Sequence, residues 1–274
     1  MKLLADGGST KVDWLMTDED GNVSRYTSVG INPTILTETT IERELLSVAE
    51  QWPLIKEATE VEFYGAGCTP IAVPKMQKCL AQILNKAESI IVGSDIIGAA
   101  KALLNDKEGI ACILGTGACS CLWGQTGDGM GIVAQTPALG YILGDEGSGA
   151  VLGKMMINAM YKGVLPAEIR EDFEQEYGVD MYGVIENVYR KSAANRWLAS
   201  ISPFVMKHMD NELVELIVKD NLRAFFIRNI LPYQRPDLEV SFVGSVAFYY
   251  EEQLRSVAEE SGIRIGKVQA SPLA

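Results

Sequence analysis

Three short runs rich in glycine stand where an apolar, strand-like segment ends, and turns of this composition can bind an anion. In chain order they are Asp6-Gly7-Gly8-Ser9-Thr10, Gly115-Thr116-Gly117 and Val243-Gly244-Ser245. Because glycine has no Cβ, successive backbone N–H groups can approach a ligand and form an anion-binding concavity. Any one of these runs could also be an ordinary hairpin turn. The presence of three in one chain favours a phosphate site.

Carboxylates lie beside these turns or at similar strand ends, and each has a structural alternative. Asp6 precedes the first pair of glycines, where it could hold a metal or cap the turn through nearby N–H groups. Asp95 follows an apolar strand-like segment and precedes a helical one, so it could be a helix N-cap or a group at a ligand site. Asp145 and Glu146 lie between glycines ahead of a long helix, where they could cap the helix and interact favourably with its dipole, or accept hydrogen bonds from a ligand.

Two familiar nucleotide-binding loops do not occur at the expected places. The sequence contains no G-x-x-x-x-G-K-[ST] run, which excludes a Walker-type loop. No G-x-G-x-x-G run opens a helix after the first strand, which makes a dinucleotide-binding Rossmann domain a weak interpretation.

A pattern of strand, glycine turn, strand, Asp-Gly turn and strand occurs twice at nearly equal intervals. The first copy runs from Asp6 to a turn at Gly21, and the second from Gly115 to a turn at Gly129. Similarity of this kind predicts a duplicated supersecondary unit. If the two copies face each other, their glycine turns would hold a polyphosphate from both sides of a cleft.

Hydrophobic periodicity predicts an α/β fold with mixed sheets covered by helices. The expected strands are residues 3–5, 12–16, 23–27, 61–64, 89–92, 110–114, 119–123, 132–134, 239–243 and 264–268. The expected helices are residues 37–52, 74–87, 96–104, 148–161, 166–177, 181–191, 193–201, 203–219, 221–231 and 246–261. A polar linker at residues 106–109 divides the chain into expected domains 1–107 and 108–274, the second with a helical insertion at about 150–237.

The composition limits the possible partners and the compartment. The net charge of the 274 residues is −12, and no basic stripe is present, so we expect no nucleic-acid partner. No apolar run has the length of a membrane span, and no signal peptide begins the chain, so we expect no membrane partner and a cytoplasmic protein. The five cysteines fit no zinc pattern and are expected to be buried free thiols.

The three glycine turns, in this order, resemble the two phosphate motifs and the adenosine motif of the actin, sugar kinase and heat-shock chaperone superfamily. More narrowly, the chain is similar to the N-acetylglucosamine kinase family and its BadF/BadG/BcrA/BcrD-type ATPase relatives. The sharpest match is the block of residues 143–149, Leu-Gly-Asp-Glu-Gly-Ser-Gly. The resemblance covers nearly the whole chain. It implies two ribonuclease H-like (actin-type) domains with mixed sheets around a central cleft, and a helical addition in the second.

The resemblance also implies roles for individual residues in phosphoryl transfer, which needs positioning, charge stabilisation, a metal and a base. Asp95 would be the catalytic base rather than a helix cap, and Asp6 would hold Mg²⁺ through water. ATP and its phosphates would bind at Gly7, Gly8, Ser9, Thr10, Lys11, Gly115, Thr116, Gly117, Gly244 and Ser245. The sugar would bind at Asn32, Asp95, Thr116, Asp145 and Glu146. Lys11 could equally be solvated, and Asn32 an ordinary turn residue.

The chain departs from the family pattern in two places. The loop 65–68, Gly-Ala-Gly-Cys, lies where relatives present small residues to the sugar, and the sequence assigns no role to Cys68. In relatives a Pro-Leu pair begins a terminal helix rich in glycine and alanine, and we expect this helix to be missing after residues 271–274.

Three functions are compatible with these observations. The resemblance favours an ATP- and Mg²⁺-dependent kinase of an amino sugar, foremost the 6-hydroxyl of N-acetylglucosamine. An ATPase that activates a partner reductase or dehydratase through a shared iron–sulfur cluster ranks lower, because no cysteine pair is arranged for a dimer axis. A non-catalytic sugar or nucleotide sensor would have no need of a base such as Asp95. The sequence does not define the oligomeric state, and a homodimer is one alternative.

Overall fold

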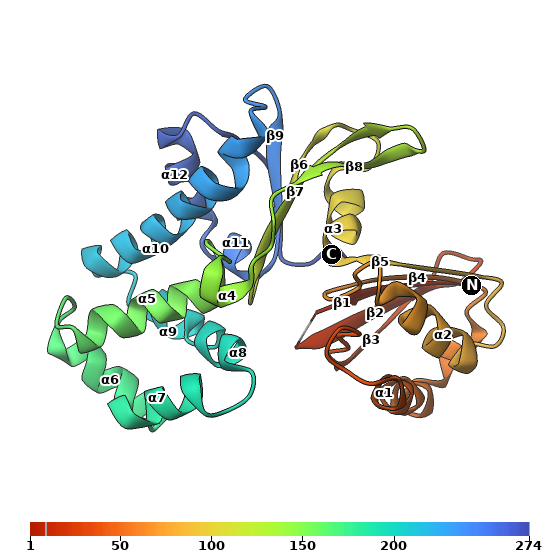
Figure 1. Ribbon diagram of the computed structural model, residues 1–274, viewed down its shortest axis with the longest axis horizontal. Helices are drawn as coiled ribbons and strands as arrows, with labels where there is room; N and C mark the ends of the chain where they lie inside the picture. The colour runs from red at the N-terminus through yellow and green to blue at the C-terminus, as the bar shows by residue number, and fades with distance from the viewer. Residues whose placement is uncertain (9, 274) are drawn as a thin grey trace. The chain divides into compact units, whose positions relative to one another are not determined.

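The computed structural model describes residues 1–8 and 10–273, so that the predicted phosphate ligand Ser9 lies outside the described residues. Two compact units divide the chain, Met1–Ala102 with Leu273 and Leu103–Pro272. Figure 1 shows one β-sheet with its helices in each unit. The domain boundary expected between residues 107 and 108 stays a prediction, because compactness in space does not by itself define a domain in the chain. No helix of the described residues is long and apolar enough to cross a membrane.

The sheet of the first unit has five strands in the order β3-β2-β1-β4-β5. They are β1 (Lys2–Gly7), β2 (Lys11–Thr17), β3 (Val23–Val29), β4 (Glu60–Gly65) and β5 (Ser89–Ser94). The first three strands are antiparallel, whereas β1, β4 and β5 run parallel. The carboxyl ends of these three parallel strands therefore meet at one edge of the sheet.

Alternating burial fixes which face of this sheet packs against helices. Leu3 and Ala5 of β1, and Val12, Trp14 and Met16 of β2, point into the core. Helices α1 (Glu38–Gln51) and α2 (Val73–Ile83) pack together and supply the other side of that core. A 3₁₀ turn η1 (Pro53–Glu57) follows α1, and α3 (Asp95–Leu104) follows β5 directly.

The sheet of the second unit repeats this topology, with the order β10-β9-β6-β7-β8. Its strands are β6 (Gly109–Leu114), β7 (Ala118–Thr126), β8 (Gly129–Gln135), β9 (Glu239–Val243) and β10 (Arg264–Gln269). Again the first three strands are antiparallel, and β6, β9 and β10 are parallel. The duplicated unit and the α/β fold class predicted from the sequence are confirmed.

Most helices of the second unit lie between β8 and β9. In chain order they are α4 (Gly140–Leu143), α5 (Gly149–Tyr161), α6 (Ala167–Tyr177), α7 (Met181–Tyr189), α8 (Ala194–Ala199), α9 (Ser202–Lys207) and α10 (Glu212–Phe225). A π-helical turn η2 (Phe226–Ile230) and a 3₁₀ turn η3 (Leu231–Tyr233) end this region, and α11 (Ser245–Tyr249) and α12 (Glu251–Glu260) separate β9 from β10.

The structure differs from the predicted helices at several breaks. The helix predicted at residues 203–219 ends at Lys207, because Asn211 caps a new helix, α10, by accepting hydrogen bonds from the N–H groups of Leu213 and Val214. No break occurs near residue 220, and Asn221 lies inside α10 instead of beginning a helix. The helix predicted at residues 246–261 is interrupted at Tyr250. Periodicity alone does not reveal such breaks, since apolar spacing continues across them.

Candidate functional site

The carboxyl edge of the first sheet brings two of the predicted carboxylates, Asp6 and Asp95, together on a glycine-lined surface. Asp6 and Gly7 end β1, and Gly7 pairs with Gly65 at the end of β4. The N–H of Ala66 donates to the carbonyl of Gly7 at 2.7 Å. A Cβ on Gly7 would lie 2.8 Å from Phe63 and 3.2 Å from the Gly65 Cα, so these two strand ends can approach only without side chains.

Asp6 is surrounded by negative charge. Burial, followed by the nearby carboxylates of Asp95 and Asp13, raises the pKa of Asp6 to about 7, while Lys11 acts to lower it. Asp13 lies on β2 directly opposite Asp6. The sequence reading missed Asp13, although counting the hairpin register from the glycine turn would have placed it there. Several neighbouring carboxylates supply oxygen atoms, and oxygens are the usual ligands of Mg²⁺.

Among the described residues, no group of three or more His, Cys, Asp or Glu side chains is arranged to hold a metal. Mg²⁺ keeps several waters and commonly binds through one or two carboxylates together with substrate phosphates. The carboxylate of Asp6 fits this mode of binding, whereas both oxygens of Asp13 already have partners, the Thr27 hydroxyl and the Lys11 ammonium.

Asp95 is the first residue of α3 and follows β5 without an intervening loop. Its Oδ1 accepts a hydrogen bond of 2.9 Å from the N–H of Ile96, so the carboxylate is held at the helix start. Burial raises the pKa of Asp95, while hydrogen bonds from backbone N–H groups oppose that shift. The position therefore combines the predicted helix-start geometry with a carboxyl group whose proton affinity is increased.

Asn32 packs against the loop that follows β4. Its Oδ1 accepts a hydrogen bond from the N–H of Thr34, and the hydroxyl of Thr34 donates to the carbonyl of Gly67 at 2.7 Å. Gly67 has φ +78°, and a Cβ there would lie 2.0 Å from the Asn32 Oδ1. The Gly-Ala-Gly-Cys loop thus needs its second glycine both for backbone conformation and for space.

Cys68, which the sequence left without a role, is buried next to this edge. Burial and the charge of Asp95 raise the pKa of its thiol to about 12. The thiol therefore stays protonated and inert near the carboxylate. Cys79, Cys112 and Cys121 are also buried free thiols, as predicted, whereas Cys119 is half-buried.

The first glycine turn is closed by its own backbone. The N–H of Gly8 donates to the carbonyl of Lys11 at 2.8 Å. Thr10 and Lys11 are exposed, and the Lys11 ammonium pairs with the Asp13 carboxylate at 2.6 Å. The phosphate-binding roles of Gly7, Gly8, Thr10 and Lys11 stay predictions.

The second glycine turn is tied to the start of helix α5. The N–H of Gly149 donates to the carbonyl of Gly115 at 2.8 Å, and the N–H of Ala150 donates to that of Thr116 at 3.2 Å. The N–H of Gly115 donates to the carbonyl of Gly117 at 3.0 Å. This turn and the helix start therefore form one hydrogen-bonded structure.

The third glycine turn lies beside the second because β9 runs parallel to β6. Gly244 has φ +118°, and a Cβ there would lie 2.3 Å from the carbonyl oxygen of Leu114. Only glycine fits this contact without displacing the backbone. Ser245, the other predicted adenosine-site residue, is exposed at the start of α11. The second and third glycine turns thus share the carboxyl edge of the second sheet.

Asp145 and Glu146 lie at this same edge. Asp145 is a non-glycine residue with φ +56°. Its carboxylate accepts a hydrogen bond from the N–H of Ala118, and a Cβ on Gly117 would lie 3.1 Å from its Oδ2. Burial, with a contribution from Glu146, raises its pKa. The cap of α5 is Ser148, whose hydroxyl accepts from the N–H of Val151, so Asp145 is left available for another role.

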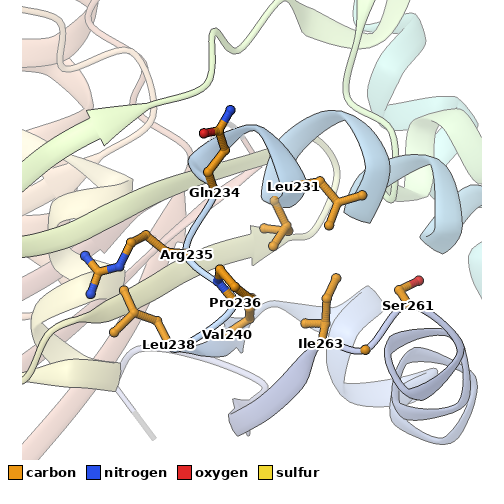
Figure 2. A pocket seen from close by; sticks show the side chains of 10 residues that line it. Leu231, Gln234, Arg235, Pro236, Leu238, Val240, Ser261 and Ile263 are labelled. Atoms are coloured by element: carbon orange, nitrogen blue, oxygen red, sulfur yellow. The ribbon is translucent and has the colours of Figure 1, made fainter.

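A separate cavity of about 220 Å³ lies in the second unit. Figure 2 shows its lining side chains, which include Leu231, Arg235, Leu238, Val240 and Ile263. The cavity touches the beginning of β9, whereas the glycine turn at Gly244 follows the end of that strand. The cavity is therefore distinct from the glycine-lined edge.

Each unit has the repeated sheet topology and a glycine-lined carboxyl edge, and these features define the actin-like ATPase fold of the sugar kinases. No family model matches the chain, and no curated protein matches it. Among solved structures, a Porphyromonas gingivalis protein that carries the provisional name N-acetylglucosamine kinase is 45% identical, with a TM-score of 0.96 over 100% of this chain and 96% of its own. The chain belongs to the N-acetylglucosamine kinase family.

Two more distant structures share the fold. A provisionally named N-acetylglucosamine kinase from Chromobacterium violaceum is 15% identical, with a TM-score of 0.74 over 97% of this chain and 93% of its own. The ethanolamine utilization protein EutJ from Carboxydothermus hydrogenoformans is 14% identical, with a TM-score of 0.53 over 99% of this chain and 85% of its own.

Proposed function

We propose that the protein transfers the γ-phosphoryl group of ATP to an amino sugar, and that the acceptor is the 6-hydroxyl of N-acetylglucosamine. The observation that carries this proposal is the gathering of Asp6, Asp13 and Asp95 at one glycine-lined sheet edge. Phosphoryl transfer needs a base and a metal site beside phosphate-binding backbone, and the carboxylates and glycines of this edge support the proposal that it supplies them. The choice of sugar rests on the likeness to the Porphyromonas gingivalis protein.

Asp95 is the proposed base. The hydrogen bond from the N–H of Ile96 fixes one carboxylate oxygen, which leaves the other to accept the proton of the attacking sugar hydroxyl. Burial raises the pKa of Asp95, which makes its carboxylate a stronger base than that of an exposed aspartate.

Asp6 would hold Mg²⁺, directly or through water. The ion would neutralise charge on the phosphates of ATP. This local charge matters because the net charge of −12 repels an anionic nucleotide at long range.

The remaining predicted residues divide between nucleotide and sugar. We propose that ATP is bound by the backbone and hydroxyls of residues 7–11, by residues 115–117, and by Gly244 and Ser245. Asn32, Asp145, Glu146 and Thr116 would accept or donate hydrogen bonds at the sugar hydroxyls. The bonds that tie residues 115–117 to α5 support this division, because they couple the proposed phosphate-binding turn to the start of the helix that follows the Asp145 loop. We expect the protein to act in the cytoplasm, where ATP is available.

The test is a panel of sugars with ATP and Mg²⁺, scored by release of ADP. We expect turnover to be stimulated by N-acetylglucosamine well above that by glucosamine, muramic-type sugars or glucose. An absence of sugar-stimulated turnover with every amino sugar would overturn the proposal. Sugar-independent ADP release would favour an ATPase, and binding without turnover would favour a sensor.

A further inference from the structure

Asn221 is a buried polar side chain in an otherwise apolar stretch of α10. It is 1% exposed, and its neighbours Val218, Leu222 and Phe225 belong to the core. A buried amide without partners is unfavourable because its lost hydration is not replaced, so a side chain of this kind needs hydrogen bonds. Asn221 makes them outside its own helix, to the loop that contains Asp145 and Glu146.

The oxygen and the nitrogen of the Asn221 amide form hydrogen bonds to two consecutive residues of this loop. Its Oδ1 accepts from the N–H of Gly147 at 2.9 Å, and its Nδ2 donates to the carbonyl of Ser148 at 3.1 Å. Gly147 has φ +83°, and a Cβ there would lie 2.8 Å from the Cβ of Phe225. Helix α10 therefore supports the loop by contact as well as by hydrogen bonds.

The π-helical turn after α10 adds a third connection. A π-turn inserts one residue into a helix and changes the direction of the side chains that follow. Arg228, within this turn, makes an ion pair with the Glu146 carboxylate at 3.3 Å. The carbonyl of the next residue, Asn229, accepts a hydrogen bond of 3.0 Å from the buried Ser120 hydroxyl, which anchors the turn to β7.

The loop needs such support because Asp145 is held at φ +56°. A non-glycine residue in the left-handed region is strained and persists only where its surroundings determine it. The bonds from α10 form part of these surroundings, and they hold the loop whose Asp145 carboxylate accepts a hydrogen bond from the N–H of Ala118.

We propose that Asn221 and Arg228 are positioning residues that fix the Asp145–Glu146 loop in its ligand-binding conformation. Asn221 acts through the backbone of Gly147 and Ser148, and Arg228 acts through the carboxylate of Glu146. The inference rests on the proposed function in one respect, since it takes the ligand of this loop to be the amino sugar. The expected signature is a loss of sugar affinity larger than the loss of ATP affinity.

The first test compares Asn221→Leu with a matched control, Asn187→Leu. Asn187 is also a buried asparagine, but its amide bonds to Gly183 and Lys191 within its own region of α7. We expect Asn221→Leu to raise the KM for N-acetylglucosamine about tenfold or more, which corresponds to about 1.4 kcal/mol of lost binding. The KM for ATP should change less than threefold, and Asn187→Leu should destabilise the protein without changing the sugar KM.

Arg228 tests the same inference without a risk to folding, because its side chain is 68% exposed. We expect Arg228→Ala to raise the sugar KM about threefold, and Arg228→Lys to restore it, since an exposed ion pair has a modest effect. Asn221→Asp serves if the leucine variant does not fold. It keeps the acceptor for Gly147 and places an oxygen opposite the Ser148 carbonyl.

Hydrogen exchange separates the inference from the proposed kinase activity. The Gly147 amide should exchange at least tenfold faster in Asn221→Leu than in the wild type, while Asn187→Leu leaves it unchanged. If the wild type phosphorylates no sugar but this exchange result is obtained, the proposed function fails and the positioning of the loop stands. Unchanged Gly147 exchange, or equal sugar KM values in Asn221→Leu and Asn187→Leu, would overturn the inference.

Discussion

The side chains of the first sheet edge acquire their chemistry from their surroundings. Asp6 and Asp95 are ordinary carboxylates in the sequence, but burial raises the pKa of each in the structure. Asp13 adds a third carboxylate opposite Asp6. Perturbed carboxylates that cluster at one edge are typical of functional sites, because a fold without such a role has no reason to retain the repulsion.

Asp95→Asn tests the proposed base. Asparagine caps a helix start about as well as aspartate does, so the variant should fold and retain ATP binding. We expect kcat to fall by about 10²–10⁴-fold, the usual contribution of a general base. Steady-state ADP release and nucleotide titration would measure the two effects.

Asp180→Asn is the matched control for Asp95→Asn. Asp180 caps α7 through a hydrogen bond from the N–H of Gly183 at 2.9 Å, and it is not among the proposed site residues. Its replacement should leave kcat unchanged. If Asp95→Asn also keeps full activity, Asp95 is not the base.

Asp6 should make stability depend on pH when no divalent cation is present. Its pKa is about 7 in the folded protein and 3.8 as the ordinary value, so the folded state binds more protons between these values. Stability from this group is therefore present below about pH 4 and is lost as the pH rises towards 7. In EDTA, we expect the unfolding free energy of the wild type to fall over this pH range by roughly 2–4 kcal/mol more than that of Asp6→Asn, since one pKa unit corresponds to about 1.4 kcal/mol.

Urea unfolding at several pH values would measure this difference between wild type and Asp6→Asn. The comparison cancels the contributions of titrating groups that do not interact with Asp6, whereas those of Asp13 and Asp95 change with the substitution. Parallel pH profiles for the two proteins would show that the Asp6 pKa is not raised by folding.

At the scale of elements, the strands and the site edges could be predicted from the sequence, whereas several helix limits could not. Alternating burial in β1 and β2 follows from the spacing of Leu3, Ala5, Val12 and Trp14. The apolar pattern of α10, by contrast, gives no sign that Asn221 lies buried inside it, because an amide is favourable there only through bonds to a distant loop. Contacts between elements far apart in the chain carry the part of the site that the sequence did not reveal.

Gly67→Ala tests whether the loop after β4 is shaped by its contact with Asn32. Alanine would meet both a positive φ and the Asn32 side chain, so we expect a destabilisation of about 2–4 kcal/mol and a raised sugar KM. Gly21→Ala is the control, since Gly21 has φ +83° with nothing within 4 Å of a Cβ. It should cost only about 1 kcal/mol and leave the sugar KM unchanged. Thermal unfolding and steady-state kinetics would measure both effects. Equal effects of the two substitutions would contradict a role for the Asn32 contact.

At the scale of the whole molecule, the repeated sheet topology was predictable because both copies keep the same order of strands and turns.

The proposed parts of the reaction are divided between the two compact units, with the base and metal carboxylates in one and Asp145 and Gly244 in the other. Transfer between bound ATP and bound sugar requires that water be excluded from both. We therefore expect the radius of gyration to decrease when saturating sugar and a nucleotide analogue are added together. Small-angle scattering curves that coincide with and without both ligands would contradict this expectation.

The central claim is that this protein phosphorylates an amino sugar with ATP. The most direct test is to incubate it with N-acetylglucosamine, ATP and Mg²⁺ and to identify the products by phosphorus and proton NMR. The account predicts one phosphate ester at the 6-hydroxyl and one ADP for each sugar consumed, with both products formed about 10²–10⁴-fold more slowly by Asp95→Asn. ADP without a sugar ester, or an ester at another hydroxyl, would contradict it.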